Sequence, residues 1–274
     1  APESSASSPA FSPDGRWLSF LASRDDGETQ VWALDRRGGE AVPLTEVEQG
    51  VGGYVWSPDG TRLLLSIRDP EPDDSTWTSD EPEPWVVDRL QFKRDGAGYL
   101  TGSRKTHLYV FDLASREVRQ LTTGPWDEGS PAWSPDGTRI AFVSNRTPDP
   151  DTNVDSNIWI VDADLTEPTA APRKVTTQPG QDGSPAWSPD GRTLAYVTTP
   201  DVDAIWYATS HLAVISVDGG APRLLTESLD RNVGSPRWSD DGRWIWFGLE
   251  DSAENHVVRI RPDGTGFERM VAGP

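Results

Sequence analysis

Short stretches with an apolar residue at every second position recur along the chain. Three of them share one form, Ile140-Ala141-Phe142, Leu194-Ala195-Tyr196 and Ile245-Trp246-Phe247. Such alternation is typical of a β-strand, whereas a helix would show a period of about 3.6 residues. No segment of convincing length has helical periodicity. The pattern therefore predicts an all-β protein built from many short strands.

The same pentapeptide precedes each of these stretches. FSPDG, WSPDG or WSDDG occupies residues 11–15, 56–60, 133–137, 187–191 and 238–242. The aspartates of the five copies are 45, 77, 54 and 51 residues apart. A propeller blade of four strands takes roughly 40–50 residues. The spacing therefore predicts a β-propeller in which one of the units carries an insertion.

The pentapeptide itself predicts a tight hairpin turn. Proline presets the backbone for the first central position of a type I turn, and aspartate tolerates the second position. Glycine then takes the positive φ of a glycine bulge. Each copy is thus expected to join the first and second strands of a blade.

Two further strands complete each predicted blade. The third is apolar and usually ends in aspartate, as in 107–112 (HLYVFD) and 157–162 (NIWIVD), and the fourth ends in a motif such as QLT or KVT. We therefore predict a single propeller domain over residues 1–274, with five four-stranded antiparallel blades. These blades are expected at about residues 8–45, 53–122, 130–177, 184–226 and 235–272.

The insertion lies in the second predicted blade, at residues 69–106. Its first part, DPEPDDSTWTSDEPEP, is acidic and rich in proline, and its second part predicts a hairpin that turns at Lys93-Arg94-Asp95-Gly96. An insertion on one blade commonly carries a binding or interdomain contact. An exposed loop without a function is an equally weighted alternative.

Composition and charge narrow the possible functions. The formal net charge of −19 argues against binding to nucleic acid or to an anionic membrane. Solubility is the simplest role for this charge, and a preference for cationic ligands is the alternative. The absence of cysteine excludes disulfides and thiolate metal sites. No apolar run approaches the roughly 20 residues that a membrane-spanning helix needs.

The repeated SPAWSPDG, the IAFVSNR and NIWIVDAD segments and the LT endings resemble the propeller repeats of TolB-type proteins and of the prolyl oligopeptidase family of serine peptidases. Residues 85–122 resemble more closely the acylaminoacyl-peptidase and dipeptidyl-peptidase-like branch of that family. The resemblance implies a propeller of about seven blades, followed by an α/β-hydrolase domain that carries Ser, Asp and His. It also implies that the propeller restricts entry to small peptides. The present sequence departs from this pattern, with five repeats and no hydrolase domain.

A nucleophile is not evident. No serine lies in the Gly-x-Ser-x-Gly turn that such hydrolases use. Ser130, Ser184 and Ser235 come nearest, in GSPAW or GSPRW, but they recur with the repeat and precede a proline that enters a strand. We therefore expect no catalytic residue in this chain, and substrate-binding residues cannot be assigned.

The three histidines, His107, His211 and His256, share one repeat position at the start of the third strand. Other blades have Gln30 or Asn157 there. Equivalent positions on different blades are separated by at least the width of a blade. A shared catalytic or metal site is therefore not expected.

One acidic stretch, PDPDTNVDSN, spaces oxygen ligands as a calcium loop does. Such a loop also needs glycine at its sixth position and glutamate at its twelfth, and both are missing here. A polar loop is the preferred interpretation, and we expect neither a metal nor a cofactor. The residues concerned are Asp149, Asp151, Asn153, Asp155 and Asn157.

Three functions remain open. The favoured one is a non-catalytic, substrate-gating propeller of an acylaminoacyl or oligopeptidase-type serine peptidase, with the α/β-hydrolase domain and a peptide substrate as partners. The alternative is a TolB-like scaffold that binds proteins. A propeller enzyme with its own site in the central channel is disfavoured, because the sequence supplies no ligand set for such a site.

The five repeats are in phase, since each begins with the first strand and ends with the fourth. No strand is then shared between the two termini, so we expect either a closed five-bladed ring or a homo-oligomer in which end blades cover one another. By analogy with the family, a cytoplasmic location is expected.

Overall fold

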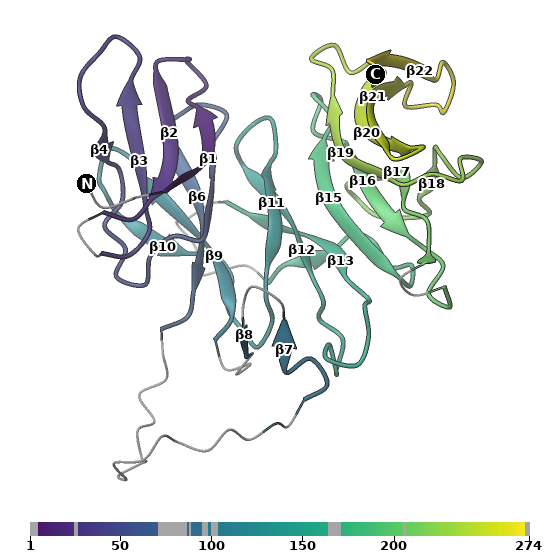
Figure 1. Cartoon of the computed structure of the whole chain (residues 1–274), viewed down its shortest axis with the longest axis horizontal. Coiled ribbons are helices and arrows are strands. Elements are labelled where there is room, and N and C mark those ends of the chain that lie inside the picture. Colours follow the sequence, from purple (N-terminus) through teal and green to yellow (C-terminus); the bar gives the residue numbers. More distant parts are fainter. Residues whose placement is uncertain are drawn as a thin grey trace.

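Five antiparallel sheets of four strands form the protein, and each sheet is one blade. The computed structural model describes residues 5–24, 27–70, 87, 89–94, 98–99, 104–163, 171–204 and 207–271. The blades follow one another in sequence order, from the purple N-terminal blade to the yellow C-terminal blade (Figure 1). The predicted all-β fold of five four-stranded blades is therefore confirmed.

Strands are labelled as in Figure 1. Blade 1 has β1 (Ala6–Phe11), β2 (Trp17–Ala22), β3 (Gln30–Asp35) and β4 (Val42–Pro43). Blade 2 has β5 (Gly53–Trp56), β6 (Arg62–Arg68), β9 (Thr106–Asp112) and β10 (Val118–Gln120). Blade 3 has β11 (Gly129–Trp133), β12 (Arg139–Ser144), β13 (Asn157–Asp162) and β14 (Arg173–Lys174). Blade 4 has β15 (Gln181–Trp187), β16 (Thr193–Thr199), β17 (His211–Ser216) and β18 (Arg223–Leu224). Blade 5 has β19 (Val233–Trp238), β20 (Ile245–Asp251), β21 (Glu254–Ile260) and β22 (Glu268–Val271).

The predicted hairpin of the insertion is present between β6 and β9. It consists of β7 (Lys93–Arg94) and β8 (Gly98–Tyr99), paired Lys93 to Tyr99 and Arg94 to Gly98. The turn residues Asp95 and Gly96 and the acidic stretch 71–86 lie outside the described residues.

The pentapeptide folds as the predicted turn. In blade 3 the Gly137 N–H donates to the Ser134 carbonyl at 2.9 Å, and Gly137 has a φ of 68°. The Ser134 hydroxyl donates to Asp136 Oδ1 at 2.5 Å, and the Arg139 N–H donates to that hydroxyl at 2.9 Å. Serine and aspartate thus satisfy the polar groups that the turn would leave unpaired. The same serine–aspartate bond recurs at Ser12, Ser57, Ser188 and Ser239.

The turns also stack from blade to blade. A Cβ added to Gly60 would lie 3.4 Å from Pro13 of the preceding blade, and one added to Gly242 would lie 3.7 Å from Pro189. The tryptophan of the motif adds a hydrogen bond, as when Trp187 Nε1 donates to the Ala132 carbonyl at 3.0 Å. Every residue type of the pentapeptide therefore shapes the turn or a contact between blades.

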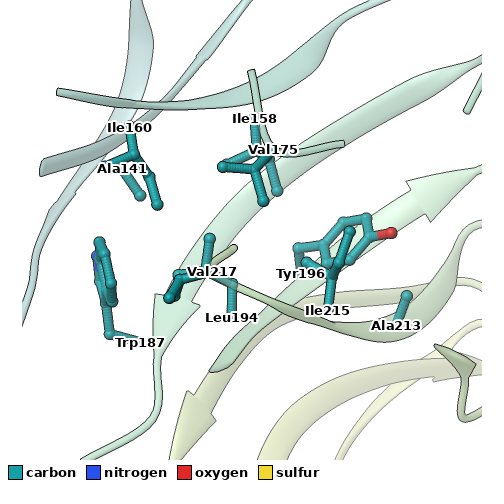
Figure 2. Packing of buried hydrophobic residues seen from close by; sticks show 10 residues of the cluster. All are labelled: Ala141, Ile158, Ile160, Val175, Trp187, Leu194, Tyr196, Ala213, Ile215 and Val217. Atoms are coloured by element: carbon teal, nitrogen blue, oxygen red, sulfur yellow. The ribbon is translucent and has the colours of Figure 1, made fainter. Parts of the chain in front are cut away.

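Apolar clusters fill the seams between consecutive blades. Ile158 and Ile160 of blade 3 pack against Leu194 and Tyr196 of blade 4 (Figure 2). Because successive side chains of a strand point to opposite faces, Ala195 lies between these two residues and packs toward blade 5. In blade 4, bulky side chains thus face the preceding blade and a small one faces the following blade.

The first strand of four blades contains a β-bulge that the sequence did not reveal. In β11 the register shifts between Gly129 and Ala132, and Ser130 between them has a φ of 47°. The first strand is an edge of its sheet, and a bulge followed by proline prevents pairing with a foreign strand. The same left-handed serine recurs at Ser8, Ser184 and Ser235.

Blade 1 and blade 5 lie apart at the two ends of the series (Figure 1). Leu18, Phe20 and Trp32 occupy positions of blade 1 that face the preceding blade elsewhere, and they are only partly buried. Phe11, which pairs with Leu18 across the strands, is 60% exposed. The backward face of blade 1 is thus an apolar surface without a blade against it.

Candidate functional site

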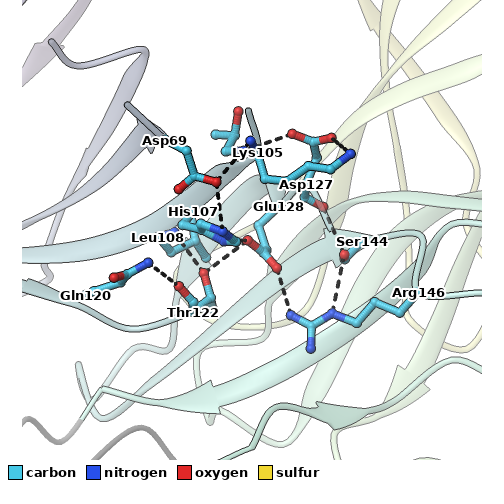
Figure 3. A network of polar contacts seen from close by, with 11 residues as sticks. Asp69, Lys105, His107, Leu108, Gln120, Thr122, Asp127, Glu128, Ser144 and Arg146 are labelled. Carbon is cyan, nitrogen blue, oxygen red and sulfur yellow. Dashed lines mark hydrogen bonds and ion pairs between the residues drawn. The ribbon is translucent and has the colours of Figure 1, made fainter. Parts of the chain in front are cut away.

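Buried polar side chains meet at the seam between blades 2 and 3 and form the candidate site (Figure 3). They come from the start of β9, from the residues leading into β11 and from the end of β12. We call this end of the blades, opposite the Ser-Pro-Asp-Gly turns, the loop end. The insertion also leaves blade 2 here, since it connects β6 to β9.

Glu128 is the centre of the network, and its side chain is completely buried. Its Oε2 accepts hydrogen bonds from His107 Nδ1 at 2.7 Å and from Thr122 Oγ1 at 3.1 Å. Its Oε1 accepts from Arg146 Nη2 at 2.8 Å. The hydrogen bond to Glu128 raises the pKa of His107, because it favours the charged imidazolium.

Aromatic rings hold the guanidinium of Arg146. Its Cζ lies 4.9 Å from the ring centroids of both Trp126 and Trp159, and 5.4 Å from that of Phe142. Rings that surround a cation attract it through their negative faces. The Arg146 side chain is therefore fixed both by Glu128 and by stacking.

The network also fastens both ends of the insertion to blade 3. Asp69 Oδ2 lies 3.6 Å from His107 Nε2 and accepts the Lys105 N–H at 3.1 Å. Lys105 Nζ lies 3.5 Å from Asp127 Oδ2, and Asp127 Oδ1 accepts the Thr106 N–H at 2.9 Å. The residues on either side of the insertion thus have a rigid base.

A second contact ties the insertion to the loop between β12 and β13. Asp151 Oδ1 accepts the Gln91 N–H at 2.9 Å, and Asp151 Oδ2 accepts the Leu90 N–H. The insertion is thus held against blade 3 at Asp151.

The arrangement does not provide hydrolytic chemistry. A triad needs a nucleophile against the base, but His107 contacts a carboxylate through each ring nitrogen. Ser144 is the hydroxyl beside Arg146, and it donates to the Asp127 carbonyl at 2.8 Å. The described residues therefore combine a base and an acid without a nucleophile, and the network holds loops in position.

The serines considered from sequence lie far from any triad geometry. Ser130, Ser184 and Ser235 are exposed bulge residues of β11, β15 and β19, on three different blades. Their left-handed backbone belongs to the edge of each blade.

The histidines are also separate, as the repeat predicted. His107, His211 and His256 lie in the third strands of blades 2, 4 and 5. His211 Nδ1 contacts the Thr226 carbonyl at 3.1 Å, and His256 Nε2 lies 3.9 Å from Glu254 Oε2. Among these contacts of the described residues, His107 is the histidine with a fully buried carboxylate as its partner.

The acidic stretch of blade 3 does not converge as a calcium loop. Asp151 binds the insertion, and Asn153 Oδ1 accepts the Asp155 N–H at 2.9 Å and Asn145 Nδ2 at 2.9 Å. Asp149 contributes its backbone carbonyl to Asn153, and Asn157 already belongs to β13. In the described ranges, no group of three or more histidine or acidic side chains is placed to hold a metal ion.

Sequence reasoning missed Glu128 and Arg146. The signal was the comparison of DEGSPAW at 127–133 with QDGSPAW at 181–187, which places an acidic residue at the same point of two repeats. An acid that is buried at this position needs a partner, because a buried charge is unfavourable without one.

A hollow of about 420 Å³ at the loop end of blade 5 is a second feature. Asp230, Arg231, Glu250, Asp251 and Glu254 contribute to its lining. Arg231 Nε donates to Asp251 Oδ1 at 2.7 Å and Arg269 Nη2 pairs with Asp251 Oδ2, so the four acidic side chains outnumber these two cations. Such a surface favours positively charged ligands.

The fold and the repeats define the class of the protein as a β-propeller. Residues 64–181 match the family model of the dipeptidyl peptidase IV (DPP IV) N-terminal region. A relative, the uncharacterized peptidase YuxL of Bacillus subtilis, is 36% identical over 163 residues, which cover 58% of this chain and 25% of the relative. Over these residues the chain is thus similar to the N-terminal regions of peptidases, in agreement with the resemblance to prolyl oligopeptidase-family propellers.

Solved structures agree on the fold. The acylaminoacyl peptidase of Pyrococcus horikoshii superposes with a TM-score of 0.71 at 18% identity, over 98% of this chain and 39% of that protein. TolB of Acinetobacter baumannii superposes with a TM-score of 0.59 at 18% identity, over 95% of this chain and 53% of that protein. The chain therefore spans only part of the length of each of these proteins. In the part of the chain that the structure describes, no helix has the length and apolar character to cross a bilayer.

Proposed function

We propose that the chain is the non-catalytic propeller of an acylaminoacyl or oligopeptidase-type serine peptidase, and that it restricts which peptides reach an α/β-hydrolase domain. The main support is the match to the DPP IV N-terminal region, because its range, 64–181, contains the described ends of the insertion and the whole Glu128 network. The partners in this proposal are the hydrolase domain and the peptide.

The structure supports this role through rigidity. Asp69 and Lys105, at the two ends of the insertion, are held by the network, and Asp151 holds its hairpin against blade 3. Elements that select a ligand by size need a fixed position, because loop ordering otherwise weakens discrimination. The insertion is thus suited to limit entry at the loop end of blades 2 and 3.

Hydrolysis assays test the non-catalytic part of the proposal. The isolated chain should not cleave dipeptidyl or acylaminoacyl p-nitroanilides above the uncatalysed rate, because the nucleophile and an oxyanion hole are missing from the described site. Turnover that persists through purification and disappears on mutation of a residue of this chain would contradict it.

The gating part needs the hydrolase domain. In a polypeptide that joins this propeller to that domain, replacing residues 87–103 with a short Gly-Ser linker should raise kcat/KM for long peptides relative to dipeptides. The matched control places the same linker at residues 36–41, the turn between β3 and β4. An unchanged ratio of the two substrates would exclude gating by the insertion.

A TolB-like scaffold remains the second candidate, supported by the shared fold. Labelling of the full-length gene product with a fluorophosphonate probe separates the two. A labelled serine outside residues 1–274 supports the peptidase, and a full-length product without a reactive serine supports the scaffold. A cytoplasmic location is proposed with the peptidase function and is checked by fractionation of cells that express the native gene.

The backward face of blade 1 supports a proposal about assembly. We propose that another blade covers Leu18, Phe20 and Trp32, either within a ring of about seven blades or from a second copy of the chain. The isolated chain should then self-associate as its concentration rises, and Phe20→Glu should make it monomeric in light scattering. A wild-type chain that stays monomeric at high concentration would contradict self-association.

A further inference from the structure

Two acidic residues occupy the same position in consecutive repeats. Glu128 and Asp182 each stand directly before the Gly-Ser-Pro of the first strand. The Glu128 N–H donates to the Thr106 carbonyl at 2.9 Å, and the Asp182 N–H donates to the Ser156 carbonyl at 2.9 Å. Each acid therefore lies against the start of the third strand of the preceding blade, at the loop end.

The hydroxyl framework around the two acids is also the same. Thr122, the last residue of QLT in blade 2, donates to Glu128. Thr176, the last residue of the corresponding KVT in blade 3, lowers the pKa of Asp182 by hydrogen bonding. Thr198 at the end of β16 acts in the same direction on Asp182, from the position that Ser144 holds in β12. Consecutive seams thus offer one framework with an acid at its centre.

The cations of the first seam are missing from the second. The repeat aligns Thr106 with Ser156, and the preceding residues are a lysine in blade 2, Lys105, and an aspartate in blade 3, Asp155. Two further basic residues of the first seam have no basic counterpart in the second. The repeat places Asn157 where the first seam has His107, and Pro200 where it has Arg146. The seam between blades 3 and 4 therefore has an acid in place of Lys105, has Gln181 in place of Asp127, and lacks three basic side chains of the first seam.

The acid of this seam is left without a neutralising partner. Asp182 is 3% exposed, and its Oδ2 has no hydrogen-bond partner among the described residues. Oδ1 of Asp155, one residue before the backbone contact, is likewise buried and unpartnered. Burial raises the pKa of Asp182 to about 6, with a smaller contribution from the charge of Asp155. The other charged or titratable groups that face it are Lys174, whose charge acts weakly in the opposite direction, and Tyr196.

We propose that Asp182 and Asp155 bind a divalent metal cation at the seam between blades 3 and 4, in the role that His107 and Arg146 have at the preceding seam. Carboxylate oxygens are the preferred ligands of Ca²⁺, which also accepts hydroxyls, carbonyls and water. A buried carboxylate that lacks a cationic side chain is stabilised by a bound cation. This site departs from the expectation of no metal, because the two ligands are 27 residues apart in the sequence and are brought together where the Asp182 N–H donates to the Ser156 carbonyl.

Calcium titration of the whole chain tests the site. Wild-type chain stripped with EDTA is titrated with CaCl₂ at pH 7.5 and 150 mM NaCl, by calorimetry and by thermal melting. We expect stoichiometric binding of one ion and a rise of several degrees in the melting temperature, because a ligand that binds only the folded state stabilises it. Asp182→Asn and Asp155→Asn should each weaken binding at least tenfold.

The matched control is Asp203→Asn, which removes an exposed carboxylate from the loop of blade 4 and should leave calcium binding unchanged. Asp155 is only partly buried, so its variant should fold even if the Asp182 variant does not. Affinity should also fall at pH 5, since protons compete for Asp182. A wild-type chain with no specific binding of Ca²⁺ or Mg²⁺, or binding that survives both substitutions, would overturn the proposal.

Discussion

The seam between blades 2 and 3 and the seam between blades 3 and 4 have the same apolar frame but opposite polar chemistry. In both, bulky side chains of one blade, such as Phe142 and Tyr196, pack against small or aliphatic side chains of the preceding blade. At the loop end, Glu128 is neutralised by His107 and Arg146, whereas Asp182 has no such partner. The repeat thus constrains the frame and the turns, and it leaves the loop end free to carry chemistry that differs between blades.

Substitution of Glu128 should have the largest effect on the difference in stability between the two seams. Glu128→Gln removes the buried carboxylate that Arg146 Nη2 and His107 Nδ1 share, and we expect the free energy of unfolding to fall by about 3–5 kcal/mol. Asp182→Asn is the matched change in the next blade, and in EDTA at pH 7.5 it should be neutral or stabilising, because it removes a desolvated charge. Urea unfolding followed by tryptophan fluorescence measures both. Equal losses in the two variants would show that the seams are energetically alike.

The pH dependence of stability sharpens the same contrast. The pKa of Asp182 is raised to about 6 in the folded state from 3.8, so the folded chain binds this proton more tightly than the unfolded chain. Its contribution is therefore present at low pH and is lost as the pH rises from about 4 to about 6. Without metal, we expect a loss of about 2–3 kcal/mol in wild type relative to Asp182→Asn over this window. Unfolding curves at pH 4, 5, 6 and 7 that stay parallel for the two proteins would contradict the raised pKa.

Substitutions in the Ser-Pro-Asp-Gly turns should destabilise blades 3 and 4 by similar amounts. Gly137→Val and Gly191→Val force a β-branched residue into positive φ, at a cost of about 1–3 kcal/mol each. The added Cβ would meet Arg62 Nη2 at 3.2 Å in the first case and Arg139 Nη2 at 3.5 Å in the second, so we expect Gly137→Val to be slightly worse. Thermal melts check this order. Midpoints within about a degree of wild type in both variants would mean that these glycines are not required by the turn.

Sequence reasoning could predict the frame because each of its determinants is local. A type I turn with a glycine bulge is encoded within one pentapeptide, and alternation along a strand fixes its two faces. The hairpin at Lys93 and Arg94 was predictable for the same reason. The repeat also placed the three histidines on separate blades, as the structure has them.

The site could not be predicted in the same way, because its members meet only after the blades pack. Glu128, His107 and Arg146 come from the starts of β11 and β9 and from the end of β12, and nothing local in the chain pairs them. The left-handed Ser130 was equally hidden, since a positive φ at serine has no signal of its own beyond its recurrence. Comparison of the repeats with one another, position by position, is the signal that would have shown both features.

The smallest expected effect is at His107, where the two seams differ by one side chain that can be exchanged. His107→Asn places at the first seam the residue type that Asn157 supplies at the second.

The pKa of His107 is raised above its usual 6.5 by its hydrogen bond to Glu128. The stability that its charge contributes is therefore full below about pH 6.5 and is lost as the pH rises through the folded-state pKa. We therefore expect the variant to lose about 1–2 kcal/mol at pH 6 and less at pH 9. Urea unfolding at the two pH values measures the difference, and His211→Asn, whose ring contacts a backbone carbonyl and not a carboxylate, is the matched control. A loss for His107→Asn that is the same at pH 6 and pH 9 would mean that the histidine contributes packing and a neutral hydrogen bond, and that Arg146 alone neutralises Glu128.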